Sequence, residues 1–478
     1  MDKVIKKGFF SKGLKLAENK ISKASPIQEM PLPDKVLILL QQHFGESCQP
    51  LVGRGDKVRT GQIIADSEKL FSAPLHATIT GTVTNISKVI NPFSNSIVSA
   101  VEITRTGEDS WADLEPDALI SEVSDSLNKF YSDDFKSGLL DKQTGSQDGS
   151  VLWGRLIKAI NDTGSEEIIK KIKNAGVTGL GGATFPTHVK LLTKKEINTL
   201  IINGCECEPY ITADHRIMLE YGWKVLAGAY IIFKVLSPKI AYIAIEDNKE
   251  DAIRLFNSLI EEAGLEEKFK VISIKSKYPM GAEKTLIKTV LGKKVPVGGL
   301  PMDIGAVVNN VGTVKAVFDS VSEGLPLISK VVTVTGDIGN PQNLLARIGT
   351  PINDLINYGN KLEKNSSKVI LGGPMMGNII VDLNFPVTKA VNCIMLKKTK
   401  ILYESNCIRC GRCINICPMN LMPLMYVLYA KNSKFEVLRD YHISTCIECG
   451  LCAYVCPASI PIVAYIKTAK SVLTGYGK

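Results

Sequence analysis

The sequence predicts a multidomain chain that combines β modules, an α/β domain with a mainly parallel sheet, and a small cysteine-rich domain at the C-terminus. Three observations predict this fold class. Short β-like runs broken by glycines fill the first part of the chain, strand-like and helix-like segments alternate in the middle, and one cysteine pattern occurs twice near the end. The length of 478 residues leaves room for roughly three domains as a soft prior.

The composition is ordinary for a soluble globular protein, with 45% hydrophobic and 22% charged residues. No apolar run reaches the roughly 18 residues of a spanning helix, and the nearest, residues 225–236, contains Lys234, so we expect a buried helix there. The N-terminus shows no secretory signal, and we therefore expect a cytosolic protein. The net charge of +9 is spread along the chain, which is typical of a solvated surface and argues against nucleic acid as a partner. A membrane surface or an acidic partner remains an alternative.

Residues 50–83 contain short β-like runs that are separated by Gly55, Gly61 and Gly81. This segment resembles a barrel-sandwich hybrid of the biotinyl/lipoyl type. A carrier domain of that type would present a lysine at a tight hairpin tip, whereas "SAPLHATITG" offers His76. We therefore expect a packing or docking module. Residues 107–164 follow it, and within them residues 124–150 are polar and turn-rich.

A glycine-rich loop, "GLGGATFPT", begins at Gly179. Gly179, Gly181 and Gly182 would let the backbone approach a ligand closely and expose N–H groups to a phosphate. By itself the loop is a weak signal of nucleotide binding, because Thr184 takes the place of the last glycine in G-x-G-x-x-G.

Strands and helices alternate on both sides of this loop. A short helix is expected before it, capped by Ser165 and ended by Gly176 in the left-handed conformation. Strand-like runs lie at residues 199–203, 240–245 and 269–274, and an amphipathic helix lies at 250–264. Asn203, Glu206 and Glu208 come just after the first of these strands, where parallel α/β folds bind ligands; a helix N-cap cluster is the alternative.

The C-terminal region contains the pattern C-x2-C-x2-C-x3-C-P twice, which is the ligand pattern of bacterial-type 4Fe–4S clusters. Three cysteines of each motif bind one cluster, and the fourth, which we expect at a helix start, reaches the other cluster. The predicted ligand sets are Cys407, Cys410, Cys413 and Cys456 for one cluster, and Cys446, Cys449, Cys452 and Cys417 for the other. Two zinc ribbons are the alternative, but they would show pairs of C-x2-C. The two clusters would form an electron-conducting wire.

Four stretches occur in a fixed order and carry a resemblance to a known family. They are "GLGGATFPTHVK", "NGCECEPY", "YPMGAEKTL" and "VVNNVGTV". Together they resemble the FMN- and NADH-binding subunit of respiratory complex I. With "FPTHVKL", "GGPMMG" and the paired cysteine motifs, the chain is more similar still to the C subunit of Rnf complexes, the ion-pumping ferredoxin:NAD oxidoreductases. Residues 331–356 likewise resemble a β-grasp domain, which we interpret as a scaffold between flavin and clusters.

The resemblance implies a non-covalent FMN and NAD(H) in the α/β domain, in addition to two 4Fe–4S clusters. The residues that it implies are Gly179, Gly181, Gly182 and Lys190 lining the FMN pocket, Asn203 and Glu206 with the adjacent Cys207 on the ribityl and phosphate side, Tyr278, Gly281 and Glu283 between flavin and NADH, Asn309 and Asn310 near the flavin, and Phe185 beside the nicotinamide or adenine. No side chain is expected to be catalytic, because the flavin carries hydride transfer. Leu180 and Ala282 replace an arginine and a glutamate of complex I that concern the binding of NADH.

Two other sets of residues have competing interpretations. His188 lies inside the loop, but we expect a structural or solvent-facing histidine. Cys205, Cys207 and His215 could form a metal site, although no fourth ligand is evident.

The function implied by the resemblance is that of a peripheral subunit on the cytoplasmic side of the membrane. It would exchange hydride between NAD(H) and FMN and pass single electrons through two clusters. Its partners would be the membrane and cluster-bearing subunits of an Rnf-type complex, NADH and, indirectly, ferredoxin. Two alternatives remain: a cytoplasmic paralogue that feeds a catabolic reductase of the proline-reductase type, and a cluster scaffold with a degenerate nucleotide pocket.

The expected domains divide the chain into six parts. They are an N-terminal extension (1–34), a barrel-sandwich hybrid (35–106), a polar insertion (107–164), an FMN- and NADH-binding α/β domain (165–326), a β-grasp domain (327–390) and a ferredoxin-like domain with two 4Fe–4S clusters (391–478).

Overall fold

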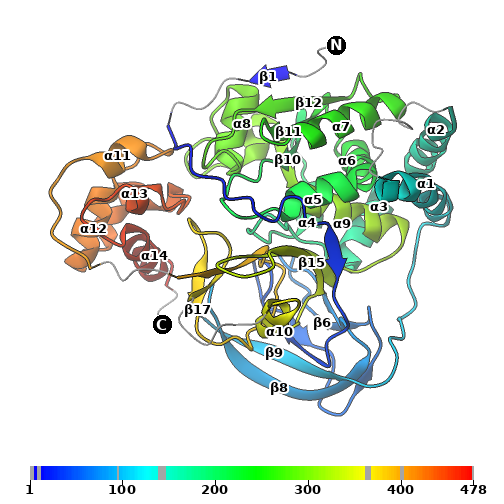
Figure 1. The fold of residues 1–478 in the computed structure, drawn as a ribbon, viewed down its shortest axis with the longest axis horizontal. Helices are drawn as coiled ribbons and strands as arrows, with labels where there is room; N and C mark the ends of the chain where they lie inside the picture. The colour runs from blue at the N-terminus through cyan, green and yellow to red at the C-terminus, as the bar shows by residue number, and fades with distance from the viewer. Residues whose placement is uncertain are drawn as a thin grey trace.

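The described chain contains four sheets and a separate small helical domain (Figure 1). The computed structural model describes residues 5–7, 12–93, 96–137, 147–360, 368–398 and 403–475. Parts of the predicted N-terminal extension (1–4 and 8–11) and of the predicted insertion (138–146) lie outside the described residues. The predicted combination of β modules, an α/β domain and a cluster domain is confirmed.

A five-stranded parallel sheet forms the centre of the α/β domain, in the order β1-β12-β11-β10-β13. Its strands are β1 (Ile5–Lys7), β10 (Thr199–Gly204), β11 (Ile240–Glu246), β12 (Phe269–Ile274) and β13 (Ala306–Asn310). The strands predicted at 199–203, 240–245 and 269–274 are confirmed. The edge strand β1 was not foreseen, and it ties the start of the chain to this sheet.

Helices cover both faces of this sheet. Leu200 and Ile202 point to one face and Ile201 to the other, because side chains alternate along a strand. The first face packs on helices that include α6 (Gly222–Leu236), α7 (Glu250–Glu262) and α9 (Val311–Ser322), and the second on α8 (Glu283–Leu291). The remaining short elements of this domain are α3 (Ser165–Asn174), α4 (Thr187–Leu191), α5 (Ala213–Glu220) and η1 (Pro301–Ile304). The buried helix predicted at 225–236 is confirmed as part of α6.

The helix before the glycine loop differs from the prediction at one end. Gly164, and not Ser165, occupies the N-cap position of α3, and no side chain caps it. Gly176 has a φ of +64°, as predicted for the residue that ends this helix.

The predicted polar insertion contains two helices, α1 (Ala118–Ser137) and α2 (Gln147–Asp162), which pack on the α/β domain. Trp153 of α2 is fully buried and donates a hydrogen bond from Nε1 to Tyr131 Oη over 2.8 Å. Tyr131 in turn donates to Glu262 Oε2 over 2.7 Å. The polar composition concealed these helices, because their few apolar residues are concentrated on the buried side.

Two small antiparallel sheets form the barrel-sandwich module. The first sheet comprises β3 (Lys35–Leu39), β5 (Lys57–Val58), β8 (Gly81–Asn91) and β9 (Ser96–Arg105), and the second β4 (Gln49–Pro50), β6 (Ile63–Asp66) and β7 (Leu75–His76). Gly81 is required at the start of β8, where this strand pairs with β9, because a Cβ there would collide with the carbonyl oxygen of Thr104.

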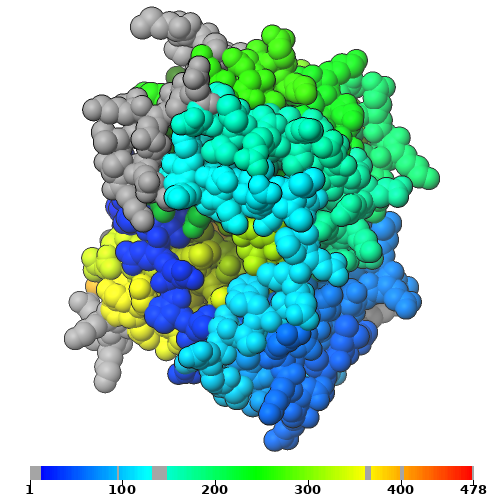
Figure 2. Space-filling model, turned by 90° about the vertical axis from the view of Figure 1, so that its right-hand side faces the viewer, coloured from blue at the N-terminus to red at the C-terminus, as the bar shows by residue number. Residues whose placement is uncertain are grey.

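A six-stranded mixed sheet forms the β-grasp region, in the order β17-β16-β18-β14-β15-β2. Its elements are β2 (Ile27–Glu29), β14 (Ser329–Gly336), β15 (Gln342–Arg347), α10 (Ile352–Asn357), β16 (Lys368–Leu371), β17 (Asn378–Ile380) and β18 (Cys393–Lys397). Both β2 and β18 lie outside the expected range 327–390. The N-terminal segment runs across the surface of this region (dark blue over yellow in Figure 2), where β2 pairs with β15.

The cysteine-rich domain has a small core of its own, around Tyr426, Leu438 and Ile466. Its elements are α11 (Arg412–Ile416), α12 (Pro423–Lys431), η2 (Glu436–Arg439), η3 (Ile443–Thr445), α13 (Leu451–Tyr454) and α14 (Ile462–Leu473). Within the described ranges, no helix combines the length and the apolar character needed to cross a bilayer.

Three buried histidines lie where the β modules meet the α/β domain: His43, His76 and His188. Lys389 of the β-grasp region joins them, and its Nζ donates to the carbonyl oxygen of Gly176 over 2.6 Å. Burial, together with the charge of Lys389, lowers the pKa of His43 to about 4 and that of His76 to about 3. Burial also lowers the pKa of His188 to about 4. The expected structural role of His188 agrees with this position.

We expect the folded protein to lose stability as the pH falls from about 6.5 toward 4. In this window the unfolded chain binds protons at these histidines and the folded chain does not, so acid favours unfolding. His76→Gln should reduce the slope of the free energy of unfolding against pH by up to about 1.4 kcal/mol per pH unit. Denaturant unfolding of both proteins at pH 7.5, 6.5 and 5.5 measures the difference in slope. Equal slopes for the two proteins would contradict the expectation.

Candidate functional site

The glycine loop, residues 179–187, forms the first wall of the candidate site. Its base is closed by a hydrogen bond from the Gly179 N–H to the Phe185 carbonyl oxygen over 2.9 Å, and the Leu180 N–H donates to Thr313 Oγ1 over 2.8 Å. Gly181 and Gly182 form the exposed tip, and Gly182 has a φ of +103° with open space around the position of a Cβ. The loop is therefore anchored at its base and offers its tip to a ligand.

Two adjacent parallel strands, β10 and β13, end beside this loop. Their register pairs Asn203 with Asn310 and Ile202 with Asn309. Asn310 caps α9, because its Oδ1 accepts from the Gly312 N–H over 2.9 Å. A Cβ on Gly181 would lie 3.3 Å from Asn310 Cβ, so the loop tip packs against this strand end. The structure thus brings both asparagines of β13, Asn203 and the glycine loop together.

The loop at residues 278–283 forms the next wall. Asn203 Nδ2 donates to the Gly281 carbonyl oxygen over 2.9 Å, and the Gly281 N–H donates to Cys207 Sγ over 3.2 Å. A Cβ on Gly281 would collide with the Cys205 carbonyl oxygen, so only glycine fits there. Glu283 begins α8, and its Oε1 accepts from Lys190 Nζ over 3.2 Å.

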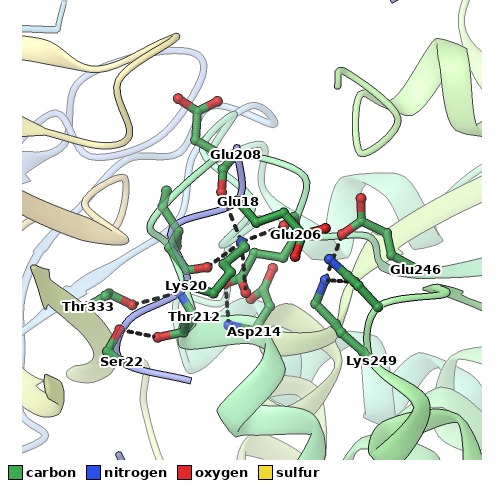
Figure 3. Close-up of polar contacts among 12 residues, drawn as sticks. Glu18, Lys20, Ser22, Glu206, Glu208, Thr212, Asp214, Glu246, Lys249 and Thr333 are labelled. Atoms are coloured by element: carbon green, nitrogen blue, oxygen red, sulfur yellow. Dashed lines mark hydrogen bonds and ion pairs between the residues drawn. The ribbon is translucent and has the colours of Figure 1, made fainter. Parts of the chain in front are cut away.

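A buried polar network holds the chain just after β10 (Figure 3). Glu206 Oε1 accepts from the Asp214 N–H over 2.8 Å. Lys20 Nζ lies 3.7 Å from Glu206 Oε2 and donates to the carbonyl oxygens of Glu206 and Glu208, over 2.7 and 2.9 Å. Burial, and next the charge of Glu206, raises the pKa of Asp214 to about 7. Sequence reasoning missed Lys20, which lies 186 residues away from Glu206.

Three of the predicted site residues lie on a different pocket. Glu206, Cys207 and Tyr278 line a small pocket whose other walls include Leu16 and Lys20 of the N-terminal segment. No residue of the glycine loop lines it. These three residues therefore support the strand ends from the side of the N-terminal segment.

Phe185 follows the glycine loop and forms an aromatic cluster with two residues of the barrel-sandwich module. Its ring stacks on Phe44, with centroids 5.6 Å apart, and meets Phe71 edge-on at 6.0 Å. Phe44 is 60% exposed and Phe71 is 43% exposed. Sequence reasoning missed these two phenylalanines, because nothing in their local pattern distinguishes them from scattered surface residues.

The residues present fit a flavin mononucleotide on three observations. Asn309 is buried, yet its Nδ2 finds no hydrogen-bond partner within the described part of the chain, so it can donate to a ligand. The exposed loop tip at Gly182 leaves backbone N–H groups available to a phosphate. The loop at Gly281 closes one side of the same strand ends, because its carbonyl oxygen accepts from Asn203 Nδ2.

One predicted cysteine set lines a single cavity. Cys417, Cys446, Cys449 and Cys452 all contribute to the wall of this cavity. Burial raises the pKa of Cys449 to about 12, so a thiolate there needs the compensating positive charge of iron. Among the described residues, no three potential ligands are grouped closely enough to hold a single metal ion, the set Cys205, Cys207 and His215 included. A sulfur-lined cavity of this kind fits a multi-iron cluster.

The other predicted set lies closer to solvent. Cys407 and Cys410 are exposed, and Cys413 and Cys456 are half-buried. The expectation that the fourth cysteine of each motif starts a helix is wrong. Cys417 directly follows the end of α11, and Cys456 lies two residues after the end of α13. Each short helix carries the third cysteine of its motif, Cys413 or Cys452, and the proline after the fourth cysteine prevents the helix from continuing.

Family models match three parts of the chain. A RnfC barrel sandwich hybrid domain matches residues 9–108, a Nuo51 FMN-binding domain matches residues 172–319, and a 4Fe–4S dicluster domain matches residues 406–460. These matches coincide with the barrel-sandwich module, the α/β domain and the cysteine-rich domain.

Curated relatives match nearly the whole chain. The C subunit of the proton-translocating ferredoxin:NAD(+) oxidoreductase complex of Clostridium ljungdahlii is 39% identical, over 87% of this chain and 83% of the relative. The C subunit of the Na(+)-translocating complex of Acetobacterium woodii is 35% identical, over 90% and 89%. The C subunit of the ion-translocating oxidoreductase complex of Pseudomonas aeruginosa is 36% identical over 91% of this chain, but only 52% of that longer relative.

Proposed function

The chain belongs to the family of C subunits of ion-translocating ferredoxin:NAD(+) oxidoreductase complexes, and from this premise we propose that it exchanges hydride with NAD(H) at an FMN held by the α/β domain and relays electrons through two 4Fe–4S clusters. Its partners are the other subunits of an Rnf-type complex. The long matches to complete relatives favour this function over a cytoplasmic paralogue that serves a catabolic reductase.

The observation that supports the flavin site best is the meeting of three separate segments at the ends of β10 and β13. The glycine loop packs on Asn310, Asn203 holds the carbonyl oxygen of Gly281, and Asn309 offers an amide that has no partner among the described residues. Ligands of α/β folds bind at this end of parallel strands. Among the other site residues expected from the family resemblance, Glu206 and Cys207 are proposed to support the FMN site from the side of the N-terminal segment.

Each group has a distinct proposed role. The N–H groups around Gly182 bind phosphate, and the amide of Asn309 donates to the flavin ring or its ribityl chain. FMN, when bound, supplies the chemistry that converts a two-electron hydride donor into a source of single electrons. Lys190 and Glu283 form an ion pair at the rim, where they orient NADH. Phe185, with Phe44 and Phe71, offers an aromatic surface to a planar ring of the dinucleotide.

We further propose that the protein is bound peripherally to the cytoplasmic face of the membrane through its partner subunits. Ion translocation, which the names of the relatives state for their complexes, requires a membrane. Native fractionation should recover the chain with membranes in the presence of its partners. Recovery entirely in the soluble fraction would instead favour the cytoplasmic paralogue.

Flavin analysis of the anaerobically purified protein tests the proposal. We expect about one non-covalent FMN per chain, as the single set of strand ends implies. Addition of NADH should bleach the flavin absorbance and then reduce the clusters. A protein that carries both clusters but neither contains FMN nor reacts with NADH would be a cluster scaffold.

Glu283→Ala should weaken reduction by NADH more than it lowers FMN content. Glu283 lies at the rim, 39% exposed, where its carboxylate pairs with Lys190, so its removal changes the entrance and leaves the strand ends intact. Stopped-flow bleaching at several NADH concentrations, with FMN content measured in parallel, checks this. Glu122→Ala is the matched control, because Glu122 of α1 is likewise an exposed carboxylate in an ion pair, with Arg155 at 2.9 Å. If FMN is lost in proportion to activity, Glu283 belongs to the flavin pocket.

A further inference from the structure

One hydrogen bond joins the α/β domain to the cysteine-rich domain at the candidate site. Tyr278 Oη donates to the carbonyl oxygen of Cys449 over 2.7 Å, and both residues are buried. Tyr278 begins the loop that contains Gly281, and Cys449 belongs to the set that lines the sulfur-rich cavity. A buried hydroxyl that loses its acceptor is costly, so this contact fixes the distance between the two domains.

Packing around this bond reinforces it. Tyr278, Cys449 and Leu451 form a hydrophobic cluster that also contains Met375 of the β-grasp region. Gly450 lies against the Met375 carbonyl oxygen at a distance that excludes a Cβ. Residues from three domains therefore converge on the chain around Cys449.

A second contact holds the same region in place. Glu208 Oε1 accepts from the Met375 N–H over 2.7 Å and from the Met376 N–H over 3.1 Å. On its other side, Tyr278 pairs with Leu14 through two backbone hydrogen bonds of 2.9 and 3.0 Å. The loop after β10, the N-terminal segment and the β-grasp region thus brace the Tyr278–Cys449 contact.

A short covalent path links this contact to the candidate flavin site. Tyr278 is three residues before Gly281, whose carbonyl oxygen accepts from Asn203 at the end of β10. The other cysteine set differs in its surroundings, because Cys407 and Cys410 are exposed. One set faces the α/β domain and the other faces solvent.

We propose that Tyr278 is a positioning residue that holds the Cys417, Cys446, Cys449 and Cys452 set at the flavin-side end of the cluster pair. The Cys407, Cys410, Cys413 and Cys456 set is then the outer end, which faces a partner subunit. This inference rests on the proposed function for the identity of the flavin, but the contact between Tyr278 and Cys449 stands without it.

Tyr278→Phe tests the proposal in the full-length protein with both clusters. The hydroxyl group points the positive end of its dipole at a carbonyl beside a cluster ligand, so its loss should lower the reduction potential of that cluster and leave the other unchanged. A redox titration followed by EPR measures both potentials. Cys452→Ser, which alters one ligand, assigns the signals to the two sets.

Tyr230→Phe is the matched control, because Tyr230 is a buried tyrosine whose Oη donates to Asn161 Oδ1 within the α/β domain. It should shift neither potential. Three results in a Tyr278→Phe protein with full iron content would overturn the proposal. The reduction potential could shift only for the outer cluster, shift equally for both clusters, or shift for neither. Flavin content is measured separately, so an absence of FMN counts against the proposed function and leaves the potentials interpretable.

Discussion

Replacing Cys417 with serine is expected to remove one cluster and to leave the other in place. Cys417 lies in the first cysteine motif but lines the cavity formed by Cys446, Cys449 and Cys452 of the second motif. Loss of one thiolate from this set should lower the iron content by about half, because each cluster contains the same number of irons. We expect the damaged cluster to be the one held by the second motif, although the mutation lies in the first.

Iron analysis combined with EPR measures this outcome. Cys48→Ser is the control, since Cys48 is a buried cysteine of the barrel-sandwich module, far in sequence from both motifs. It should retain both clusters. Selective loss of the cluster at Cys407, Cys410 and Cys413 in the Cys417→Ser protein would refute the ligand sets.

Gly281→Ala is expected to reduce FMN binding by roughly tenfold or more, as overpacking of a close contact costs about 1–3 kcal/mol. The added methyl group would collide with the carbonyl oxygen of Cys205 and press on Cys207 Sγ, so the loop must move away from β10. That movement breaks the hydrogen bond between Asn203 and the Gly281 carbonyl oxygen. The proposed flavin pocket would then lose one wall.

Titration of the flavin-free protein with FMN, followed by flavin fluorescence, measures this loss of affinity. Gly154→Ala is the control, because a Cβ at Gly154 of α2 meets no atom within 4 Å. Iron content reports whether the cysteine-rich domain still folds. If Gly281→Ala keeps its FMN at wild-type affinity, Gly281 does not border the pocket.

The sequence alone was sufficient for features that depend on short spacings. The repeated C-x2-C-x2-C-x3-C-P pattern predicts two ligand sets, because three cysteines at intervals of three can surround one cluster. The strands β10, β11 and β12 follow from short apolar, β-branched runs, and the parallel sheet from their alternation with helices. These signals are local, so no knowledge of the packing is required to detect them.

Other features were decided only by the tertiary structure. Lys20 reaches the backbone of Glu206 and Glu208, and Tyr278 reaches Cys449 across 171 residues of sequence. Strand β2 adds to a sheet whose other strands begin some 300 residues later, and the polar segment around α1 and α2 hides a buried Trp153. Such contacts depend on which surfaces meet when the domains pack against one another. A single lysine or tyrosine has no sequence pattern that specifies its distant partner, so the long-range contacts between the proposed flavin site and the cysteine-rich domain became evident only in the folded chain.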